Sequence, residues 1–277
     1  MTKLGKNLSR VAIIGLGAIG RTVVDRLLDG SVGKPAPKCI ALVRRQHLAE
    51  LEALYGSRLR LVTSLDELLA FSPDIVVDAA GQPAVREFAE QILTAGIDFV
   101  VVSTGALVDD AFRSRLITAG EISGSRLIVA AGAIAGLDGL GALKLSGNMR
   151  ARYISTKPPH AWRGTPAETM LDLDQLLEAT TFFRGSAADA ATRFPKNANL
   201  AATIALAGAG FAETTVELVA DPHSRGNCGR IEAEANAGKL IVEVSGPSAA
   251  ENAKTSAITA YSILNVLRGV GKPLVFR

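Results

Sequence analysis

An apolar run, a glycine-rich turn and an amphipathic segment follow one another without interruption near the N-terminus. The run is Val11-Ala12-Ile13-Ile14, the turn is Gly15-Leu16-Gly17-Ala18-Ile19-Gly20, and apolar residues over 18–29 recur at helical spacing. A short strand that ends in glycine and leads directly into a helix is typical of a buried parallel sheet. The order of these elements therefore predicts a strand–turn–helix unit at the start of such a sheet.

The spacing of the three glycines indicates what this turn can bind. Gly15 permits a tight turn, Gly17 lets backbone N–H groups approach a pyrophosphate, and Gly20 allows the helix to pack closely on the strand. The start of the helix adds a partial positive charge. A dinucleotide site is therefore expected on Gly15, Gly17, Ala18, Ile19 and Gly20, the alternative being a tight turn that binds no ligand.

Strand and helix patterns continue to alternate as far as about residue 135. Further strands are expected at 39–43, 74–78, 99–102 and 127–130. Helices are expected at 18–29, after a capping sequence at 63–67, and at 84–95. This alternation predicts βαβ units, so residues 1–135 are expected to form an α/β domain with a doubly wound parallel sheet.

A different pattern follows in the second half. A helix is expected at 197–210, strands at 214–220, 228–235 and 239–245 with Gly238 at a hairpin turn, and a closing helix at 254–268. These elements predict an antiparallel sheet in an α+β substrate and dimerisation domain covering 136–253. The closing segment, 254–277, is free to pack back on the first domain.

Composition and charge argue against several classes of binding partner. The net charge is +3 and the basic residues are spread along the chain, which argues against nucleic-acid binding. Cys39 and Cys228 form no CxxC or Cys/His cluster, so neither a disulfide framework nor a metal site is expected. No signal-peptide pattern is present, and no apolar run approaches the roughly 20 residues of a membrane span. We therefore expect a cytoplasmic protein that binds a small molecule and no membrane.

The end of the second predicted strand bears on which dinucleotide is bound. An acidic residue there suits the 2′-hydroxyl of NAD, whereas arginine suits the 2′-phosphate of NADP. The chain has Arg44 and Arg45 at this point and no acid. Guanidinium groups are planar and permanently charged, as phosphate recognition requires. We therefore expect the protein to accept NADP as well as NAD. The alternative is that the two arginines are solvent-exposed loop residues that bind no ligand.

Several later motifs, in this order along the chain, resemble one family. They are Ala79-Ala80-Gly81-Gln82-Pro83-Ala84-Val85, Ser103-Thr104-Gly105-Ala106-Leu107, Gly132-Ala133-Ile134-Ala135-Gly136-Leu137-Asp138, Lys157-Pro158-Pro159, Phe194-Pro195-Lys196-Asn197-Ala198-Asn199-Leu200-Ala201-Ala202-Thr203, Ala220-Asp221-Pro222 and Asn252-Ala253-Lys254-Thr255-Ser256. Together they closely resemble the L-aspartate dehydrogenase family across nearly the whole chain.

The resemblance implies a function. L-Aspartate would be oxidised reversibly with NAD or NADP to iminoaspartate, which is released or hydrolysed to oxaloacetate and ammonia. It implies a Rossmann domain, an α+β catalytic domain and a homodimer. By motif, Ala80, Gly81, Ala133 and Asn199 are assigned to the cofactor site. Asn199 can orient the nicotinamide carboxamide, and it can also cap the helix that it opens.

One family residue is missing. The family carries its catalytic histidine in an Asp-Pro…Asn-x-His pattern, and the matching stretch places Gly229 where the histidine should be. Three interpretations follow: His223 reaches the site from a rearranged loop, hydride transfer proceeds without a histidine, or glycine opens space for a bulkier substrate. His223 can equally be a solvated loop residue.

A few other residues are candidates for binding the substrate or an anion. Lys157 and Lys196 are possible anchors for substrate carboxylates, and either can instead be a surface cation or a phosphate contact. His160 follows two prolines that fix the backbone, and Lys254-Thr255-Ser256 is expected at a helix start with N–H groups for an anion. Trp162 and the pair Phe182-Phe183 are expected in the core or at a dimer contact.

Three functions remain open at this point. The first is an enzyme of the aspartate dehydrogenase type, acting on an amino acid or on the imine of an oxo acid. The second is an imine reductase or amine dehydrogenase of altered specificity, which Gly229 favours. The third is a dinucleotide-binding regulator without catalysis.

Overall fold

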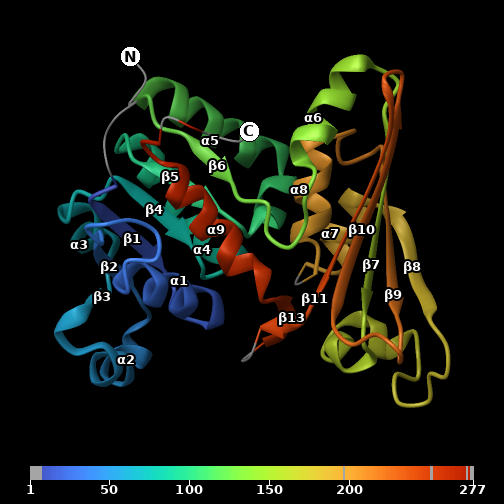
Figure 1. Cartoon of the computed structure of the whole chain (residues 1–277), viewed down its shortest axis with the longest axis horizontal. Helices are drawn as coiled ribbons and strands as arrows, with labels where there is room; N and C mark the ends of the chain where they lie inside the picture. The colour runs from blue at the N-terminus through green and yellow to red at the C-terminus, as the bar shows by residue number, and fades with distance from the viewer. Residues whose placement is uncertain (1–7, 196, 250–251, 273, 275–277) are drawn as a thin grey trace. The chain divides into compact units, whose positions relative to one another are not determined.

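The first of two units is built on a parallel six-stranded sheet (Figure 1). The computed structural model describes residues 8–195, 197–249, 252–272 and 274. The units are Met1–Ala130 with Ala260–Arg277, and Ala131–Thr259. The strands of the first sheet are β1 (Arg10–Ile14), β2 (Lys38–Leu42), β3 (Arg60–Val62), β4 (Ile75–Asp78), β5 (Asp98–Val101) and β6 (Leu127–Val129).

The strand order is β3-β2-β1-β4-β5-β6 and all neighbours run parallel. This is the order of a Rossmann sheet, and it confirms the predicted doubly wound α/β fold. The order reverses between β1 and β4. Ligands of such sheets bind beyond the carboxyl ends of the strands at this switch point.

Six helices of the described chain accompany this sheet. They are α1 (Ala18–Leu28), α2 (Leu48–Tyr55), α3 (Leu65–Ala70), α4 (Gln82–Thr94), α5 (Asp110–Ser123) and α9 (Ile258–Gly269). The predicted capping sequence is confirmed, because the Ser64 hydroxyl accepts from the Glu67 amide and the Glu67 carboxylate accepts from the Ser64 amide. Single-turn 3-10 helices lie at Arg45–His47, Gly56–Arg58 and Thr104–Val108.

The closing helix differs from its predicted bounds. It begins at Ile258, and Lys254-Thr255-Ser256 instead lies in strand β13 (Asn252–Ser256), which pairs with β12 (Ser248–Ala249). The prediction of a helix start at 254 is therefore wrong, because the backbone there pairs in a hairpin. From Ala260 onward the helix packs in the first unit, where Ile263 and Leu267 are fully buried in the core.

The second unit is built on a five-stranded sheet. Its strands are β7 (Arg150–Lys157), β8 (Thr180–Ser186), β9 (Thr214–Ala220), β10 (Asn227–Ala235) and β11 (Gly238–Gly246), in the order β11-β10-β7-β9-β8. The predicted strands at 214–220, 228–235 and 239–245 are confirmed. The predicted antiparallel pairing is confirmed for β10 with β7 and β11 and for β8 with β9, but the sheet is mixed, because β7 and β9 are parallel neighbours. The chain between them forms β8 and two helices before it returns alongside β7.

Helices cover one face of this second sheet (Figure 1). They are α6 (Leu137–Ser146), α7 (Ala187–Arg193) and α8 (Asn199–Ala207). Burial alternates along β7, so that every second residue from Ala151 to Lys157 faces the buried side. This alternation puts Tyr153, Ser155 and Lys157 in one row on the covered face.

An aromatic cluster fills the core of the second unit. Trp162, Phe182, Phe194 and Phe183 meet in edge-on pairs with ring centroids 4.8 to 5.8 Å apart. Phe182 and Phe183 are both buried although they are adjacent in β8, because the strand register shifts between Thr181 and Phe183. The expectation that these aromatic residues are structural is confirmed for the core.

Candidate active site

The glycine turn lies beyond β1, next to the end of β4. Gly15 has φ +90°, and a Cβ there would come within 2.7 Å of the Ala80 Cβ, so only glycine fits between the two strands. A Cβ on Gly20 would strike the Gly15 carbonyl oxygen. A Cβ on Gly17 would meet nothing within 4 Å. The first and third glycines are thus required by packing, and the second leaves open space at the exposed start of α1.

The exposed start of α1 can receive an anion such as a pyrophosphate. Gly17 is the N-cap residue of the eleven-residue helix α1 and makes no side-chain cap. The backbone N–H groups at this end point out of the helix, and the helix dipole favours an anion there. Ala80 and Gly81 follow β4 on the other side of the switch point, and Gly81 has φ +99°.

A buried carboxylate that the sequence analysis did not single out holds this region together. Asp78, the last residue of β4, accepts hydrogen bonds from the amides of Ala80 (3.1 Å), Gly81 (3.2 Å) and Ser103 (2.9 Å). Burial raises the pKa of Asp78, and these donors oppose that rise. The residue ties the ends of β4 and β5 together. The sequence signal that could have identified Asp78 is an acidic residue at the end of an apolar strand.

Arg44 and Arg45 follow β2 and are exposed. They lie beside the glycine turn, because the Gly15 amide donates to the Leu42 carbonyl at 2.9 Å. The Arg44 guanidinium lies 3.3 Å from the His47 ring nitrogen Nε2. Within the described residues, no carboxylate forms an ion pair with either arginine. Both guanidinium groups are therefore available to a phosphate at this edge of the sheet.

In the second unit, three motifs far apart in sequence meet. A Cβ on Gly132 would lie 3.0 Å from Leu200 of α8, and a Cβ on Gly229 of β10 would lie 3.7 Å from Ile134. The 132–134 loop therefore packs against both the start of α8 and the strand that carries Gly229. Ala133 is buried within this loop.

Asn199 is the first residue of α8, and the cap position belongs to Ala198, which makes no side-chain cap bond. The interpretation of Asn199 as the helix cap is therefore wrong. Its side chain is half-buried at the start of the helix, which packs next to the loop of Ala133. Its assignment to the nicotinamide carboxamide stays a prediction.

A buried cation lies at the end of the polar row on β7. Lys157 is 8% exposed, its Nζ donates to Asn197 Oδ1 at 3.0 Å, and it lies 5.1 Å from the Trp162 ring centroid. The ring itself is fixed, because Trp162 Nε1 donates to the Val219 carbonyl at 3.0 Å. Attraction between the ammonium group and the aromatic face partly offsets the cost of removing that group from water.

Asn197 completes this cationic site. Lysine can only donate, so the oxygen of the Asn197 amide must face Lys157 and the amide nitrogen faces away. That nitrogen, Nδ2, is buried and has no hydrogen-bond partner among the described residues. A buried donor without a partner costs roughly 1–3 kcal/mol, a cost that a bound acceptor removes. Asn197 therefore presents a buried donor that suits a carboxylate, next to the ammonium group of Lys157.

The remaining predicted residues lie elsewhere. His223 is exposed in the loop before β10, where its Nε2 lies 3.1 Å from the Leu177 carbonyl oxygen. His160 is exposed on the 3-10 helix Pro159–Trp162. Among the described contacts, none joins either histidine to Gly229 or Lys157. Lys196 lies outside the described residues.

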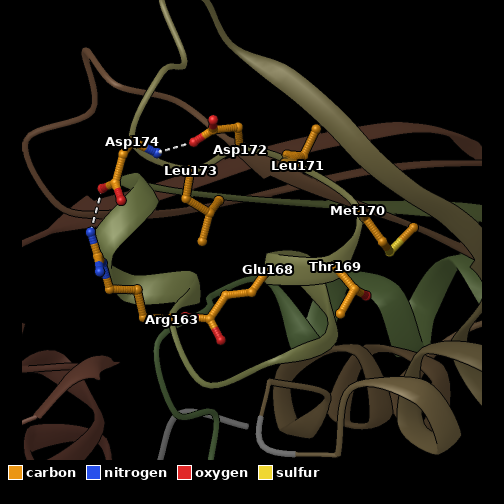
Figure 2. A pocket seen from close by; sticks show the side chains of 8 residues that line it. All are labelled: Arg163, Glu168, Thr169, Met170, Leu171, Asp172, Leu173 and Asp174. Carbon is orange, nitrogen blue, oxygen red and sulfur yellow. Dashed lines mark hydrogen bonds and ion pairs between the residues drawn. The ribbon is translucent and has the colours of Figure 1, made fainter.

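A hollow in the segment before β8 has the wrong charge for an anionic substrate (Figure 2). Its volume is about 540 Å³, and its lining residues are Arg163, Glu168, Thr169, Met170, Leu171, Asp172, Leu173 and Asp174. Arg163 is paired with Asp174, and the Asp172 carboxylate accepts from the Asp174 amide at 3.2 Å (Figure 2). The uncompensated carboxylates would repel a second anion.

Nowhere in the part of the chain that the structure describes do three or more His, Cys, Asp or Glu side chains gather as metal ligands would. No helix in the described ranges has the length and apolar character needed to cross a membrane.

Known proteins show the same division. Residues 15–130 match the family described as homoserine dehydrogenase, NAD binding domain, and residues 138–270 match aspartate dehydrogenase, C-terminal. L-Aspartate dehydrogenase 2 of Bordetella pertussis is 45% identical over 94% of this chain and 96% of its own length. L-Aspartate dehydrogenase of Serratia proteamaculans is 41% identical over 94% and 97%. The crystal structure of aspartate dehydrogenase from Thermotoga maritima has a TM-score of 0.75 and 28% identity, covering 98% of this chain and 100% of that one.

Proposed function

Because the chain belongs to the L-aspartate dehydrogenase family of NAD(P)-dependent oxidoreductases, we propose that it interconverts L-aspartate and iminoaspartate. The imine is released or hydrolysed to oxaloacetate and ammonia. The observation that carries the substrate assignment is the buried donor pair Lys157 and Asn197, which suits a carboxylate of a dicarboxylic amino acid. The nicotinamide cofactor, when bound, supplies the hydride acceptor.

The chain's own residues have separate tasks in this proposal. The turn from Gly15 to Gly20 and the start of α1 hold the pyrophosphate, with Ala80 and Gly81 on the opposite side of the switch point. Arg44 and Arg45 hold a 2′-phosphate, which favours NADP. Ala133 and Asn199 contact the nicotinamide end.

Substrate binding and orientation fall to the second unit. Lys157 and Asn197 fix one carboxylate, so that the carbon that loses hydride has a defined position relative to the polar row on β7. The ammonium form of the substrate carries no lone pair to stabilise the imine, so the amine must give its proton to water before hydride leaves. His223 has no part in this proposal, because its ring faces the Leu177 carbonyl.

The altered-specificity alternative finds no support in the contacts at Gly229. A Cβ added to Gly229 would lie only 3.2 Å from the Tyr153 hydroxyl oxygen and 3.7 Å from Ile134. Glycine at this point therefore does not open a large pocket for a bulkier substrate.

We also propose that the enzyme is a homodimer in the cytoplasm. The helix-free face of the second sheet carries alternating charges, with Arg152 and Arg184 on Glu217, and Arg230 on Glu232. A second copy can pair with such a pattern. The free cysteines Cys39 and Cys228 suit a reducing compartment. Light scattering after gel filtration and fractionation of cells test the two statements.

Steady-state kinetics test the proposed reaction. Oxidation of NADPH with oxaloacetate and ammonium should proceed, and reduction of NADP with L-aspartate should give the reverse reaction. Turnover confined to monocarboxylic oxo acids would favour the altered-specificity alternative. Tight binding of cofactor with no turnover of any amine or oxo acid would favour a regulator.

A further inference from the structure

The peptide bond between Leu16 and Gly17 lies in the middle of the glycine turn, where packing around Gly17 does not fix it. A Cβ on Gly15 would lie 2.7 Å from Ala80, and one on Gly20 would lie 2.1 Å from the Gly15 carbonyl oxygen, so packing holds both residues. A Cβ on Gly17 would meet nothing within 4 Å. Glycine has an unusually free backbone. The direction of this peptide bond therefore depends on its hydrogen bonds.

One partly buried side chain near the start of α1 holds this peptide bond. Arg21 Nε donates to the Leu16 carbonyl oxygen at 3.1 Å. Side chains of an α-helix point back toward its N-terminus, which brings position 21 to this carbonyl. The same guanidinium donates from Nη2 to Glu50 Oε1 of α2 at 3.0 Å. Because the guanidinium is planar, these two bonds to the turn and to α2 fix its position.

Holding the carbonyl group of this peptide bond also sets the direction of its N–H group. The bond is trans, so its C=O and N–H point in opposite directions. The Leu16 carbonyl points toward Arg21, and the Gly17 N–H therefore points away from that side chain. This N–H finds no acceptor within the described ranges, as expected of the first N–H groups of a helix. It is a fixed donor at the exposed end of α1.

We propose that Arg21 is a positioning residue of the cofactor site, which turns the Gly17 N–H toward the pyrophosphate by holding the Leu16 carbonyl group. The proposal rests on the proposed function for the assignment of the turn to the pyrophosphate. Arg21 does not contact the ligand in this role. A donor that is already oriented in the free protein need not be ordered when the ligand binds, and this saving appears as affinity.

A direct attraction between the charge of Arg21 and the phosphates is the competing explanation. The surroundings of Arg21 favour a positioning role, because its guanidinium is already paired with the Glu50 carboxylate at 3.0 Å and its Nε is used by the Leu16 carbonyl. Arg44 and Arg45 are exposed, and they lie at the edge of the sheet assigned above to the 2′-phosphate. The two explanations differ in whether the positive charge at position 21 matters.

Binding of two fragments of the cofactor tests the proposal without turnover. ADP-ribose contains the pyrophosphate, and adenosine 2′-monophosphate lacks it. Displacement of NADPH, followed by its fluorescence, gives the dissociation constant of each fragment. Arg21→Met keeps an unbranched side chain and removes its donors, so ADP-ribose should bind about 10-fold more weakly, as the loss of one hydrogen bond to a charged group allows. Binding of adenosine 2′-monophosphate should be unchanged.

A second substitution at the same position separates the donor from the charge. In Arg21→Gln the side-chain nitrogen is bonded to Cδ, as Nε of arginine is, so an uncharged N–H can donate to the Leu16 carbonyl from the same place. This variant should bind ADP-ribose within about 2-fold of the unmodified enzyme, because the bond to the carbonyl is kept. Equal weakening in Arg21→Gln and Arg21→Met would overturn the proposal, because that result indicates direct attraction by the charge.

Two variants at other positions control for charge and for packing. Glu50→Gln keeps an acceptor for Nη2 and leaves Arg21 without a charged partner, so ADP-ribose affinity should be unchanged, and tighter binding would contradict the proposal. Arg26→Met removes another arginine of α1, paired with Asp29 at 3.3 Å, and should affect neither fragment. An Arg21→Met variant that weakens both fragments equally indicates a general structural role and would overturn the proposal, as would one that weakens neither.

Turnover separates this proposal from the proposed function. With L-aspartate, Arg21→Met should raise the KM for NADP about 10-fold and leave the KM for L-aspartate unchanged, because Arg21 affects only cofactor binding. An enzyme that does not oxidise L-aspartate, but whose affinity for ADP-ribose depends on Arg21 as described, refutes only the proposed reaction. An enzyme that oxidises L-aspartate and binds ADP-ribose equally well after Arg21→Met refutes only the role of Arg21.

Discussion

In the first unit the proposed functional groups are backbone N–H groups on one continuous turn, whereas in the second unit they are side chains from segments far apart in sequence. The turn from Gly15 to Gly20 is specified by packing constraints between neighbouring residues and the end of β4. The row of Tyr153, Ser155 and Lys157 depends on the register of β7 with its partners. Few substitutions are tolerated where the backbone itself forms the site. Where side chains form the site, a neighbouring side chain can take over the role of one that is lost.

The largest effect is expected in the backbone site. Gly20→Ala puts a Cβ onto the Gly15 carbonyl oxygen, so the turn must deform. We expect a loss of about 1–3 kcal/mol in the free energy of unfolding and a fall in NADPH affinity of more than 100-fold. Gly17→Ala is the matched control, because its Cβ meets no protein atom and should leave stability nearly unchanged. Urea titration and NADPH fluorescence measure both; equal stabilities of the two variants would contradict the packing argument.

The next largest effect is expected in the side-chain site. Lys157→Met keeps the apolar stem against Trp162 and removes the charge, so KM for L-aspartate should rise about 10- to 100-fold. Asn197→Asp should act similarly, because the new carboxylate would pair with Lys157 and repel the substrate. Lys144→Met, at an exposed position of α6, is the control. NADPH affinity should be unchanged in all three, and a parallel loss of cofactor binding would show that the two sites are not independent.

A smaller effect is expected at the edge of the first sheet. Arg44→Ser with Arg45→Ser should weaken NADP binding about 10-fold and leave NAD binding unchanged, because only NADP carries the 2′-phosphate. Arg115→Ser, an exposed arginine of α5, is the control. Equal weakening of both dinucleotides would mean that the arginines contact a part that the two cofactors share.

The smallest effect concerns stability at low pH. The Arg152 guanidinium, with Arg184 beside it, lowers the pKa of Glu217, whose side chain is 6% exposed. A lowered folded-state pKa means that this stabilisation is complete above the unfolded-state value of about 4.5 and is lost as the pH falls through the folded-state pKa. Glu217→Gln should lower the free energy of unfolding by about 1–2 kcal/mol at pH 7 and by less at pH 3. Glu243→Gln should change it little at either pH, because the ion pair of Glu243 with Arg230 is exposed. Urea titrations of Glu217→Gln and Glu243→Gln at both pH values check this; equal losses would contradict it.

The comparison also explains what the sequence could predict. The strand–turn–helix signal located β1, the turn and α1, because each depends on local periodicity and on glycine. The resemblance to one family, now confirmed, drew attention to Gly229 and Lys157. Neither signal indicated that Tyr153 borders Gly229, because a contact between strands 76 positions apart in sequence depends on register.

Predictions from local sequence pattern were also wrong where pairing between strands decides the structure. Residues 254–256 read as a helix start, and they form a strand because β12 lies close enough to pair with them. The parallel contact of β7 with β9 was missed because β7 itself was not expected as a strand. Asp78 was missed for a related reason, since its role appears only when the ends of β4 and β5 are known to be neighbours.

The comparison of oxaloacetate with pyruvate as oxo-acid substrates tests the central claim most directly. Both react with ammonium at the same kind of carbon, but only oxaloacetate carries a second carboxylate. We predict NADPH oxidation with oxaloacetate and a kcat/KM at least about 100-fold lower with pyruvate, since one charge-assisted contact of roughly 1.5–3 kcal/mol and its orienting effect are lost. Equal kcat/KM values for the two oxo acids, or turnover of neither, would contradict it.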